Sequence, residues 1–225
     1  IRAVLPFKPS KLIVIDLNEN GLAELTRDLR STYGMYVPEE YRTYTLNFAD
    51  PIFEKIFRNE GGFDIVANFS AHKHVRSEKD QYSVEALIEN NVLKARKLMD
   101  LLVEMPPKHF FCVSTDKAAN PVNIMGCSKK VMEEMIMSYS KYFKITTARF
   151  ANVAFSNGSL LAGFIDRMMK HQPLSSPNDA MLPISSSGSW AASAMLSDSG
   201  ACSANTPMLH TVVNMIIAMT AVINR

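Results

Sequence analysis

The sequence has only three cysteines, no block of basic residues and no long apolar run. Cys112, Cys127 and Cys202 are odd in number and lack metal-ligand spacing, so we interpret them as reduced thiols of a cytoplasmic protein. A net charge of +2 without a basic stripe argues against nucleic-acid binding. The late apolar run at residues 211–223 is shorter than the about 20 residues that a membrane-spanning helix needs.

The sequence also lacks the G-x-G-x-x-G motif that binds dinucleotide phosphates at a helix start. The opening residues, IRAVLPFKPSK, show no signal peptide and predict the end of a helix followed by a turn. We therefore expect a first strand and its glycine-rich loop to lie upstream of residue 1.

Apolar runs of strand length alternate with helical patterns over residues 11–170. This order and the continuous apolar character of the runs predict an α/β fold, with a doubly wound, Rossmann-like parallel sheet incomplete at its N-terminus. We expect a domain over residues 1–179, followed by an irregular segment rich in Ser and Ala at residues 180–225. The expected strands are residues 11–17, 41–48, 63–71, 109–115 and 144–155, and the expected helices are residues 18–34, 50–62, 83–105, 126–143 and 160–170.

Polar residues follow the expected strands, and in a parallel sheet these positions meet at the carboxyl edge, where ligands bind. Asp16 either accepts hydrogen bonds from an adenosine ribose, which favours NAD over NADP, or caps the following helix. The loop with Lys73 and His74 either faces a phosphorylated substrate or is simply solvated, and its two histidines have no third metal ligand nearby. The strand-end positions are Asp16, Asn47, Ser70, His72–His74, Thr115–Lys117 and Asn152.

The stretch STDK gives the strongest local signal, because it places a hydroxyl, a carboxylate and an amine directly after an apolar strand. Thr115 can hydrogen-bond a substrate hydroxyl. Asp116 can act as an acid if burial raises its pKa, and Lys117 can act as a base in a desolvated site. Such a pair suits proton abstraction beside a carbonyl with loss of water. The alternative is a surface turn with a local ion pair.

Four stretches together resemble the extended short-chain dehydrogenase/reductase superfamily, and within it the CapD-like polysaccharide-biosynthesis branch. They are FDIVANFSAHKHV, ENNVLKARKLMDLL, FFCVSTDKAANPVNIMGCSKKVMEE and TARFANVAFSNGSLL. The branch includes inverting UDP-N-acetylglucosamine 4,6-dehydratases. Met125 stands where the superfamily has the tyrosine of its Tyr-x-x-x-Lys pair, a replacement that is common in this branch.

The resemblance implies an NAD- or NADP-dependent reaction on a nucleotide sugar such as UDP-N-acetylglucosamine, giving a 4-keto-6-deoxy sugar. It implies Lys117 as base, Asp116 as acid and Thr115 on the C4 oxygen, with Met125 and Lys129 completing the catalytic set. The cofactor-binding positions expected are Asp16, Asn47, Phe48, Ser70, Asn91 and Lys129, and the substrate-binding positions are Lys73, His74, Asn152 and Ser156.

Residues 180–225 depart from the branch, which there carries an Arg-Tyr-Phe segment and a substrate-binding helix start. We hypothesise a frameshift near Asn178 to Ala180, which sequencing of the gene would test. Two alternatives to the dehydratase stay open: a nucleotide-sugar 4-epimerase using the same site, and an inactive fragment or Rossmann-type binding module. We also predict a homo-oligomer.

Overall fold

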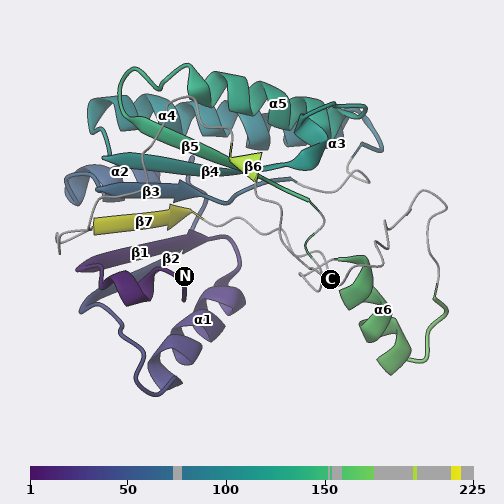
Figure 1. The fold of residues 1–225 in the computed structure, drawn as a ribbon, viewed down its shortest axis with the longest axis horizontal. Coiled ribbons are helices and arrows are strands. Elements are labelled where there is room, and N and C mark those ends of the chain that lie inside the picture. Colours follow the sequence, from purple (N-terminus) through teal and green to yellow (C-terminus); the bar gives the residue numbers. More distant parts are fainter. Residues whose placement is uncertain (73–77, 152, 154–158, 175–194, 197–213, 219–225) are drawn as a thin grey trace.

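The structure is a computed structural model, and it describes residues 1–72, 78–151, 153, 159–174, 195–196 and 214–218. Strands and helices alternate through most of the chain (Figure 1). The strands are β1 (Lys11–Asp16), β2 (Glu40–Thr45), β3 (Ile65–Asn68), β4 (His109–Thr115), β5 (Lys144–Phe150), β6 (Met195–Leu196) and β7 (Asn214–Ala218). The α-helices are α1 (Glu19–Ser31), α2 (Pro51–Asn59), α3 (Gln81–Ile88), α4 (Lys94–Glu104), α5 (Ile124–Met137) and α6 (Leu160–Met169); short helical turns are η1 (Leu5–Phe7), η3 (Glu89–Leu93) and η4 (Asp116–Ala118).

The strands form one sheet in the order β2-β1-β7-β3-β4-β5-β6, parallel except for β6. The chain goes outward from β1 to β2 and then crosses through α2 to β3 on the other side of β7. The direction of winding therefore changes between β1 and β3, which is the switch point of a doubly wound sheet. The predicted α/β fold is confirmed.

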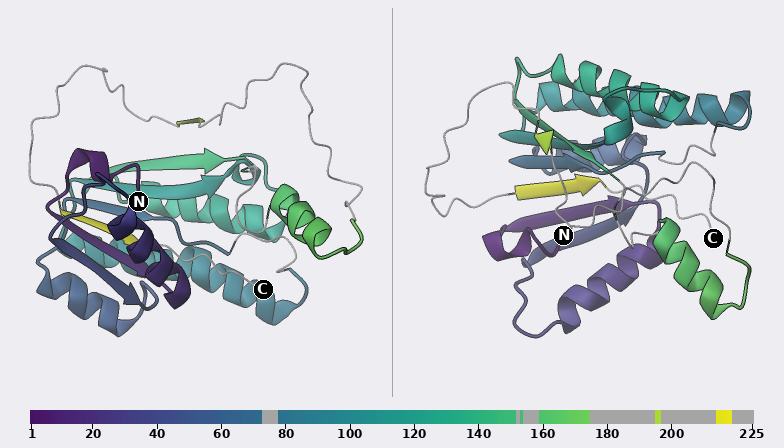
Figure 2. Two further views of the ribbon diagram at one scale, coloured as in Figure 1. Left: turned by 90° about the horizontal axis from the view of Figure 1, so that it is seen from below. Right: turned by 45° about the vertical axis from the view of Figure 1, so that its right-hand side comes forward.

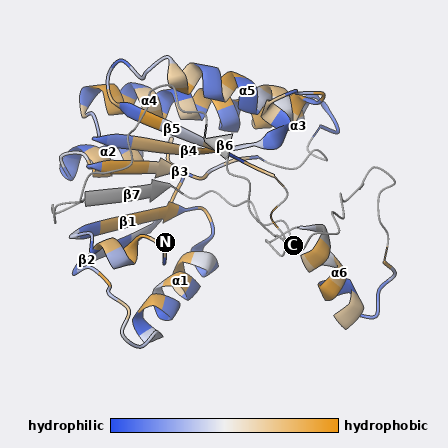
Figure 3. Cartoon of the chain, in the orientation of Figure 1, coloured by the Kyte–Doolittle hydropathy of each residue, from blue (hydrophilic) through white to orange (hydrophobic). Residues whose placement is uncertain are grey.

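Two apolar clusters cover opposite faces of the sheet, because successive residues of a strand point to opposite sides. Ile13 and Ile15 of β1 pack with residues of α2, α4 and α5. Leu12 and Val14 of the same strand pack with η1 and α1. Figures 1 and 2 show α3, α4 and α5 on one side of the sheet and α1 on the other. In Figure 3 these helices alternate between hydrophilic and hydrophobic residues, as expected of helices that bury one face.

Local signals in the sequence account for the helix ends. The Asn18 side chain caps α1 by accepting from the Gly21 N–H, and Asn123 does the same for α5 at Gly126. Pro51 occupies the first turn of α2, and Gly61 and Gly62 follow that helix with positive φ angles of 74° and 86°.

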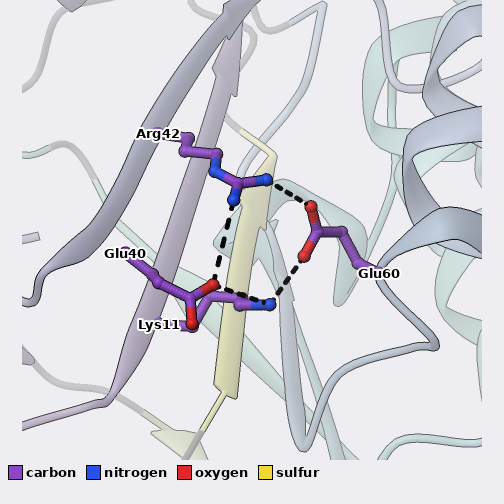
Figure 4. A network of polar contacts seen from close by, with 4 residues as sticks. All are labelled: Lys11, Glu40, Arg42 and Glu60. Atoms are coloured by element: carbon purple, nitrogen blue, oxygen red, sulfur yellow. Dashed lines mark hydrogen bonds and ion pairs between the residues drawn. The ribbon is translucent and has the colours of Figure 1, made fainter.

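The amino edge of the sheet carries a network of four charged residues (Figure 4). Lys11 Nζ lies 2.7 Å from Glu60 Oε2 and 2.9 Å from Glu40 Oε2, and Arg42 Nη1 lies 2.6 Å from Glu60 Oε1. The Glu60 side chain is only 6% exposed. The network joins β1, β2 and the end of α2, so it connects these two neighbouring strands to the helix that follows β2.

Two predicted elements differ from the structure. The helix expected at residues 83–105 is divided by the π-helical turn η3, which adds a residue to one turn where Asn91 reaches out to its partners. The segment expected to be irregular contains β6 and β7, and β7 lies inside the sheet. Within the part of the chain that the structure describes, no helix has the length and apolar character to span a bilayer.

Candidate functional site

The carboxyl ends of the parallel strands bring most of the predicted site residues to one edge. Asp16 ends β1 beside Thr45 of β2, and Thr115 ends β4 beside Phe150 of β5. Lys73, His74, Asn152 and Ser156 lie outside the described residues. The positions that the structure places at or next to this edge are Asp16, Asn47, Phe48, Ser70, Asn91, Thr115, Asp116, Lys117, Met125 and Lys129.

Thr115, Asp116 and Lys117 form a hydrogen-bonded group on the turn η4. Thr115 Oγ1 donates to Asp116 Oδ1 at 2.9 Å, and the Lys117 N–H donates to the same oxygen at 2.9 Å. Lys117 Nζ lies 3.3 Å from it. The side chains of Asp116 and Lys117 are 49% and 38% exposed, so a ligand can reach both groups.

The pKa of Asp116 differs from the expectation. Burial raises this pKa, but the Thr115 hydrogen bond and the Lys117 charge together outweigh burial, so the net shift is downward. The condition set for Asp116 as an acid, a pKa raised by burial, is therefore not met in this structure. The Lys117 ammonium, the Lys117 N–H and the Thr115 hydroxyl all stabilise the charged carboxylate, and this lowers its pKa.

The first turn of α5 packs tightly against Lys117. A Cβ on Gly126 would lie 2.8 Å from Lys117 O, closer than real Cβ contacts allow. The Met125 N–H donates to Glu78 Oε1 at 2.7 Å, so a residue near the end of the β3–α3 loop also caps this helix. We did not predict either contact. The glycine in the MGCSK stretch was a visible signal for the first, whereas nothing in the sequence marks the second.

Met125 and Lys129 lie one turn apart on α5, as the spacing predicted, and both are 3% exposed. Lys129 Nζ lies 3.4 Å from Val113 O and 3.6 Å from Met132 Sδ, two long contacts for a group with three donors. Burial lowers the pKa of Lys129, with Cys112 and Glu133 opposing that effect in part. Burial also raises the pKa of the adjacent Cys112 thiol to about 11.

Asn91 links three elements around this helix. Its amide donates to His72 O at 3.1 Å and to Ser128 Oγ at 3.0 Å, and its Oδ1 accepts from the His72 N–H at 2.9 Å. The chain leaving β3 is thereby fixed to α5 through the π-helical turn.

Three predicted cofactor positions at the other half of the edge make local contacts. Asp16 is 8% exposed, and its Oδ1 accepts from the Asn18 N–H at 2.8 Å, so it shapes the turn while Asn18 caps α1. Asn47 Oδ1 accepts from the Ala49 N–H at 3.0 Å. Ser70 Oγ donates to Asn68 Oδ1 at 2.6 Å. Each side chain closes the turn after its strand.

The side chain of Phe48 has a different environment. It is 2% exposed and belongs to the apolar cluster that contains Ile13 and Phe53. Phe48 therefore packs in the core, and its side chain has almost no exposed surface that a ligand could contact.

In the described ranges, two buried side-chain polar atoms lack a hydrogen-bond partner, Ser114 Oγ at the end of β4 and Asn90 Nδ2 on η3. Native proteins satisfy nearly all such atoms with protein, water or ligand. Among the described residues, no group of three or more His, Cys, Asp or Glu could hold a metal ion. The two positions expected to hold cofactor riboses are Asp16, which ends β1, and Lys129, whose buried amine lies beside Val113 of β4.

A family model described as "Polysaccharide biosynthesis protein" matches residues 1–182. The chain belongs to this family. It is 30% identical over 176 residues to the capsular polysaccharide biosynthesis protein CapD of Staphylococcus aureus, covering 77% of this chain and 29% of CapD. It is 26% identical over 163 residues to an inverting UDP-N-acetylglucosamine 4,6-dehydratase of Campylobacter jejuni, covering 70% of this chain and 46% of that one.

The fold also matches a solved structure of DesIV, a dTDP-glucose 4,6-dehydratase from Streptomyces venezuelae with NAD bound. The TM-score is 0.60 at 18% identity, and the alignment covers 76% of this chain and 57% of DesIV. At this identity the match supports the Rossmann-type fold alone. The chain spans no more than half the length of the curated relatives named above.

Proposed function

We propose that this chain carries the catalytic residues of a nucleotide-sugar 4,6-dehydratase acting on a UDP-N-acetylhexosamine. The observation that carries the proposal is the Thr115–Asp116–Lys117 group, reachable by a ligand at the end of β4 and backed by Gly126. The name of the Campylobacter relative and the family membership support the same reaction class.

A nicotinamide dinucleotide would be held by Asp16 at its adenosine ribose and by Lys129 at its nicotinamide ribose. When bound, this cofactor would supply reversible oxidation at the sugar C4. Asp16 disfavours a 2′-phosphate, which favours NAD over NADP. Thr115 Oγ1 would then donate a hydrogen bond to the C4 oxygen, which becomes a carbonyl and makes the C5 proton acidic.

The contact between Lys117 and Asp116 suggests how one pair supplies both proton transfers. A sugar that covers the pair removes water, and a desolvated ion pair becomes a neutral pair when the proton moves from Lys117 to Asp116. Lys117 Nζ then takes the C5 proton, and Asp116 gives its proton to the departing C6 hydroxyl, which leaves as water. The sugar C6 would then receive the hydride back from the nicotinamide, and Lys117 would return a proton to C5. The proton that the C4 hydroxyl releases on oxidation balances the one that Asp116 gives to the departing water, with solvent as its carrier.

An assay with UDP-N-acetylglucosamine and NAD tests this proposal. We expect the wild-type chain to form a 4-keto-6-deoxy sugar and Lys117→Ala to form none. Lys130→Ala is the matched control, since Lys130 has a similar exposure of 40% but pairs only with Glu134 on α5. Equal turnover in Lys117→Ala and wild type would remove Lys117 from its role.

The same assay separates the alternatives. A 4-epimerase would return the C4 epimer with its 6-hydroxyl intact, and a binding module would give no product. Calorimetry with NAD and NADP then distinguishes a module that binds the cofactor from a fragment that binds neither. The domain division at residue 179, a homo-oligomer and a cytoplasmic location remain predictions.

A further inference from the structure

An ion pair lies behind the candidate site, in the layer between the sheet and α5. Arg149 Nε donates to Glu133 Oε1 at 3.0 Å and to Oε2 at 3.2 Å, and Arg149 Nη2 donates to Oε2 at 2.5 Å. The Glu133 side chain is 8% exposed and that of Arg149 is 28% exposed. A guanidinium that holds both oxygens of a carboxylate fixes the orientation of that group. No step of the proposed reaction uses this pair.

The pair lies next to Lys129. Glu133 follows Lys129 by one turn of α5, and both residues are buried. Arg149 of β5 is in register with Ser114 of β4. Lys129 Nζ lies 3.4 Å from the carbonyl oxygen of Val113, the residue before Ser114. The amine, the carboxylate and the guanidinium therefore share one buried layer, where charges act on each other more strongly than in water.

The charges in this layer do not balance. Arg149 and Lys129 are both cations when protonated, whereas Glu133 supplies one negative charge. Burial raises the pKa of the Cys112 thiol to about 11, so this group from β4 is neutral at neutral pH. From η3, the side chain that bonds to α5 is the uncharged Asn91. Burial lowers the pKa of Lys129, and the charge of Glu133 opposes that effect through space.

We propose that Glu133 and Arg149 are positioning residues for Lys129: the carboxylate favours the ammonium form of the amine, and the guanidinium prevents the carboxylate from binding that amine directly. An ammonium has three donors and no acceptor, which suits the hydroxyl oxygens of a ribose. Direct binding to Glu133 would draw the amine one turn along α5, away from the carboxyl edge. The ribose in this inference rests on the proposed function, whereas the interaction among the three side chains does not.

The charge of Lys129 in the ligand-free full chain gives the direct test. Lysines with a carbon-13 label at Cε report their protonation by NMR, and the Lys129 signal is the one that Lys129→Arg removes. Glu133→Gln keeps the side-chain shape and should lower the pKa of Lys129 by about one unit or more, because two cations then lack a carboxylate. Arg149→Met should raise this pKa, because the freed carboxylate binds the amine. The double variant should lie between the two.

Two control variants accompany this titration. Glu134→Gln changes the residue next to Glu133, but it removes an exposed carboxylate that pairs with Lys130, so the pKa of Lys129 should not change. Arg149→Lys keeps a cation beside the carboxylate and should stay closer to the wild type than Arg149→Met does. Shifts of the Lys129 pKa in the same direction in Glu133→Gln and Arg149→Met, or no shift in either, would overturn the proposal.

The unmodified protein provides a measurement that does not depend on any variant folding. Because the Arg149 Nε–H donates to a buried carboxylate, its proton should exchange with water about tenfold or more slowly than that of Arg27, whose side chain is 72% exposed. NMR at neutral pH measures both rates. Equal exchange at the two arginines would show that Glu133 is not held, and would overturn the proposal.

Calorimetry with NAD then tests the link to a ligand. Between its own Lys129 pKa and that of the wild type, Glu133→Gln should bind NAD about tenfold or more weakly, and it should approach wild-type affinity as the pH falls. Arg149→Met should bind weakly at each pH, since Glu133 holds its amine. Equal affinity in the three proteins would overturn the positioning role. Absence of binding to the wild type would refute the proposed cofactor role of Lys129, while its titration still decides the interaction with Glu133 and Arg149.

Discussion

The two edges of the sheet treat their charged groups in opposite ways. At the amino edge, Lys11 and Glu60 are mostly buried and hold short contacts to oppositely charged partners (Figure 4). At the carboxyl edge, Lys129 is buried with two long contacts, and Ser114 Oγ has no partner. Asp116 and Lys117 are paired there but half exposed. We infer that the amino edge stabilises the fold, whereas the carboxyl edge keeps hydrogen-bonding capacity for a ligand.

Substituting one lysine at each edge should give the largest difference between the two edges in turnover and melting temperature. We expect Lys117→Ala to lower turnover by about 100-fold or more, because it removes the proposed base, with little change in melting temperature. Lys11→Ala should do the opposite, lowering the melting temperature while the folded protein keeps its turnover. Thermal unfolding and product formation measured on both variants check this, and an activity loss in Lys11→Ala at full folding would contradict it.

Removing the buried carboxylate of the amino edge should destabilise the fold. Glu60→Gln leaves Lys11 and Arg42 without their shared partner, and we expect a loss of about 2 kcal/mol in the free energy of unfolding. Glu104→Gln is the control, because its ion pair with Arg58 is exposed and should contribute little. Urea unfolding of both variants measures the difference, and equal stability would show that burial of Glu60 adds nothing.

The close packing of Gly126 should connect stability with activity. Gly126→Ala places a Cβ against Lys117 O, so α5 and η4 must separate, at a cost of about 1–2 kcal/mol and with reduced turnover. Gly163→Ala in α6 is the matched control, since no described residue outside its own helix turn has an atom within 4 Å of the added Cβ. The control should be neutral or slightly stabilising. If both glycines tolerate alanine equally, the contact at Lys117 does not position the site.

The stability that partly exposed Lys11 contributes and the stability that buried Lys129 contributes should depend on pH with opposite sign. Hydrogen bonds to Glu60 and Glu40 raise the pKa of Lys11, so its stabilisation is complete below the unfolded pKa of 10.5 and is lost as the pH rises through the folded value. Burial lowers the pKa of Lys129, so stability increases as the pH rises from its folded value towards 10.5.

Substitution by methionine isolates each effect. Lys129→Met should stabilise the protein at neutral pH and remove the increase in stability towards alkaline pH. Lys11→Met should destabilise it at neutral pH and remove the alkaline loss. Urea unfolding between pH 7 and about 12 measures both curves. Curves of the same sign for the two variants would contradict the difference between the edges.

The sequence predicted the sheet well, because apolar runs form its strands: KLIVIDL gives a strand buried after its first residue, and HFFCVST gives a strand with alternate residues buried. It also placed Met125 and Lys129 on one face of a helix. It could not predict the partners of Asn91, which depend on a π-helical turn, or the direction of the Asp116 pKa, which depends on the contact with Lys117. The place of β7 was hidden because its partners are distant in the sequence.

Solvent deuterium tests the central claim most directly. With UDP-N-acetylglucosamine and NAD in deuterated water, we expect the wild-type and Lys130→Ala proteins to give a 4-keto-6-deoxy sugar that carries deuterium at C5, and Lys117→Ala to give no product. Deuterium appears at C5 because protons on the Lys117–Asp116 pair exchange with the solvent. Product that keeps its original C5 proton, or deuterated product from Lys117→Ala at the wild-type rate, would contradict the claim that this pair at the end of β4 performs the proton transfers.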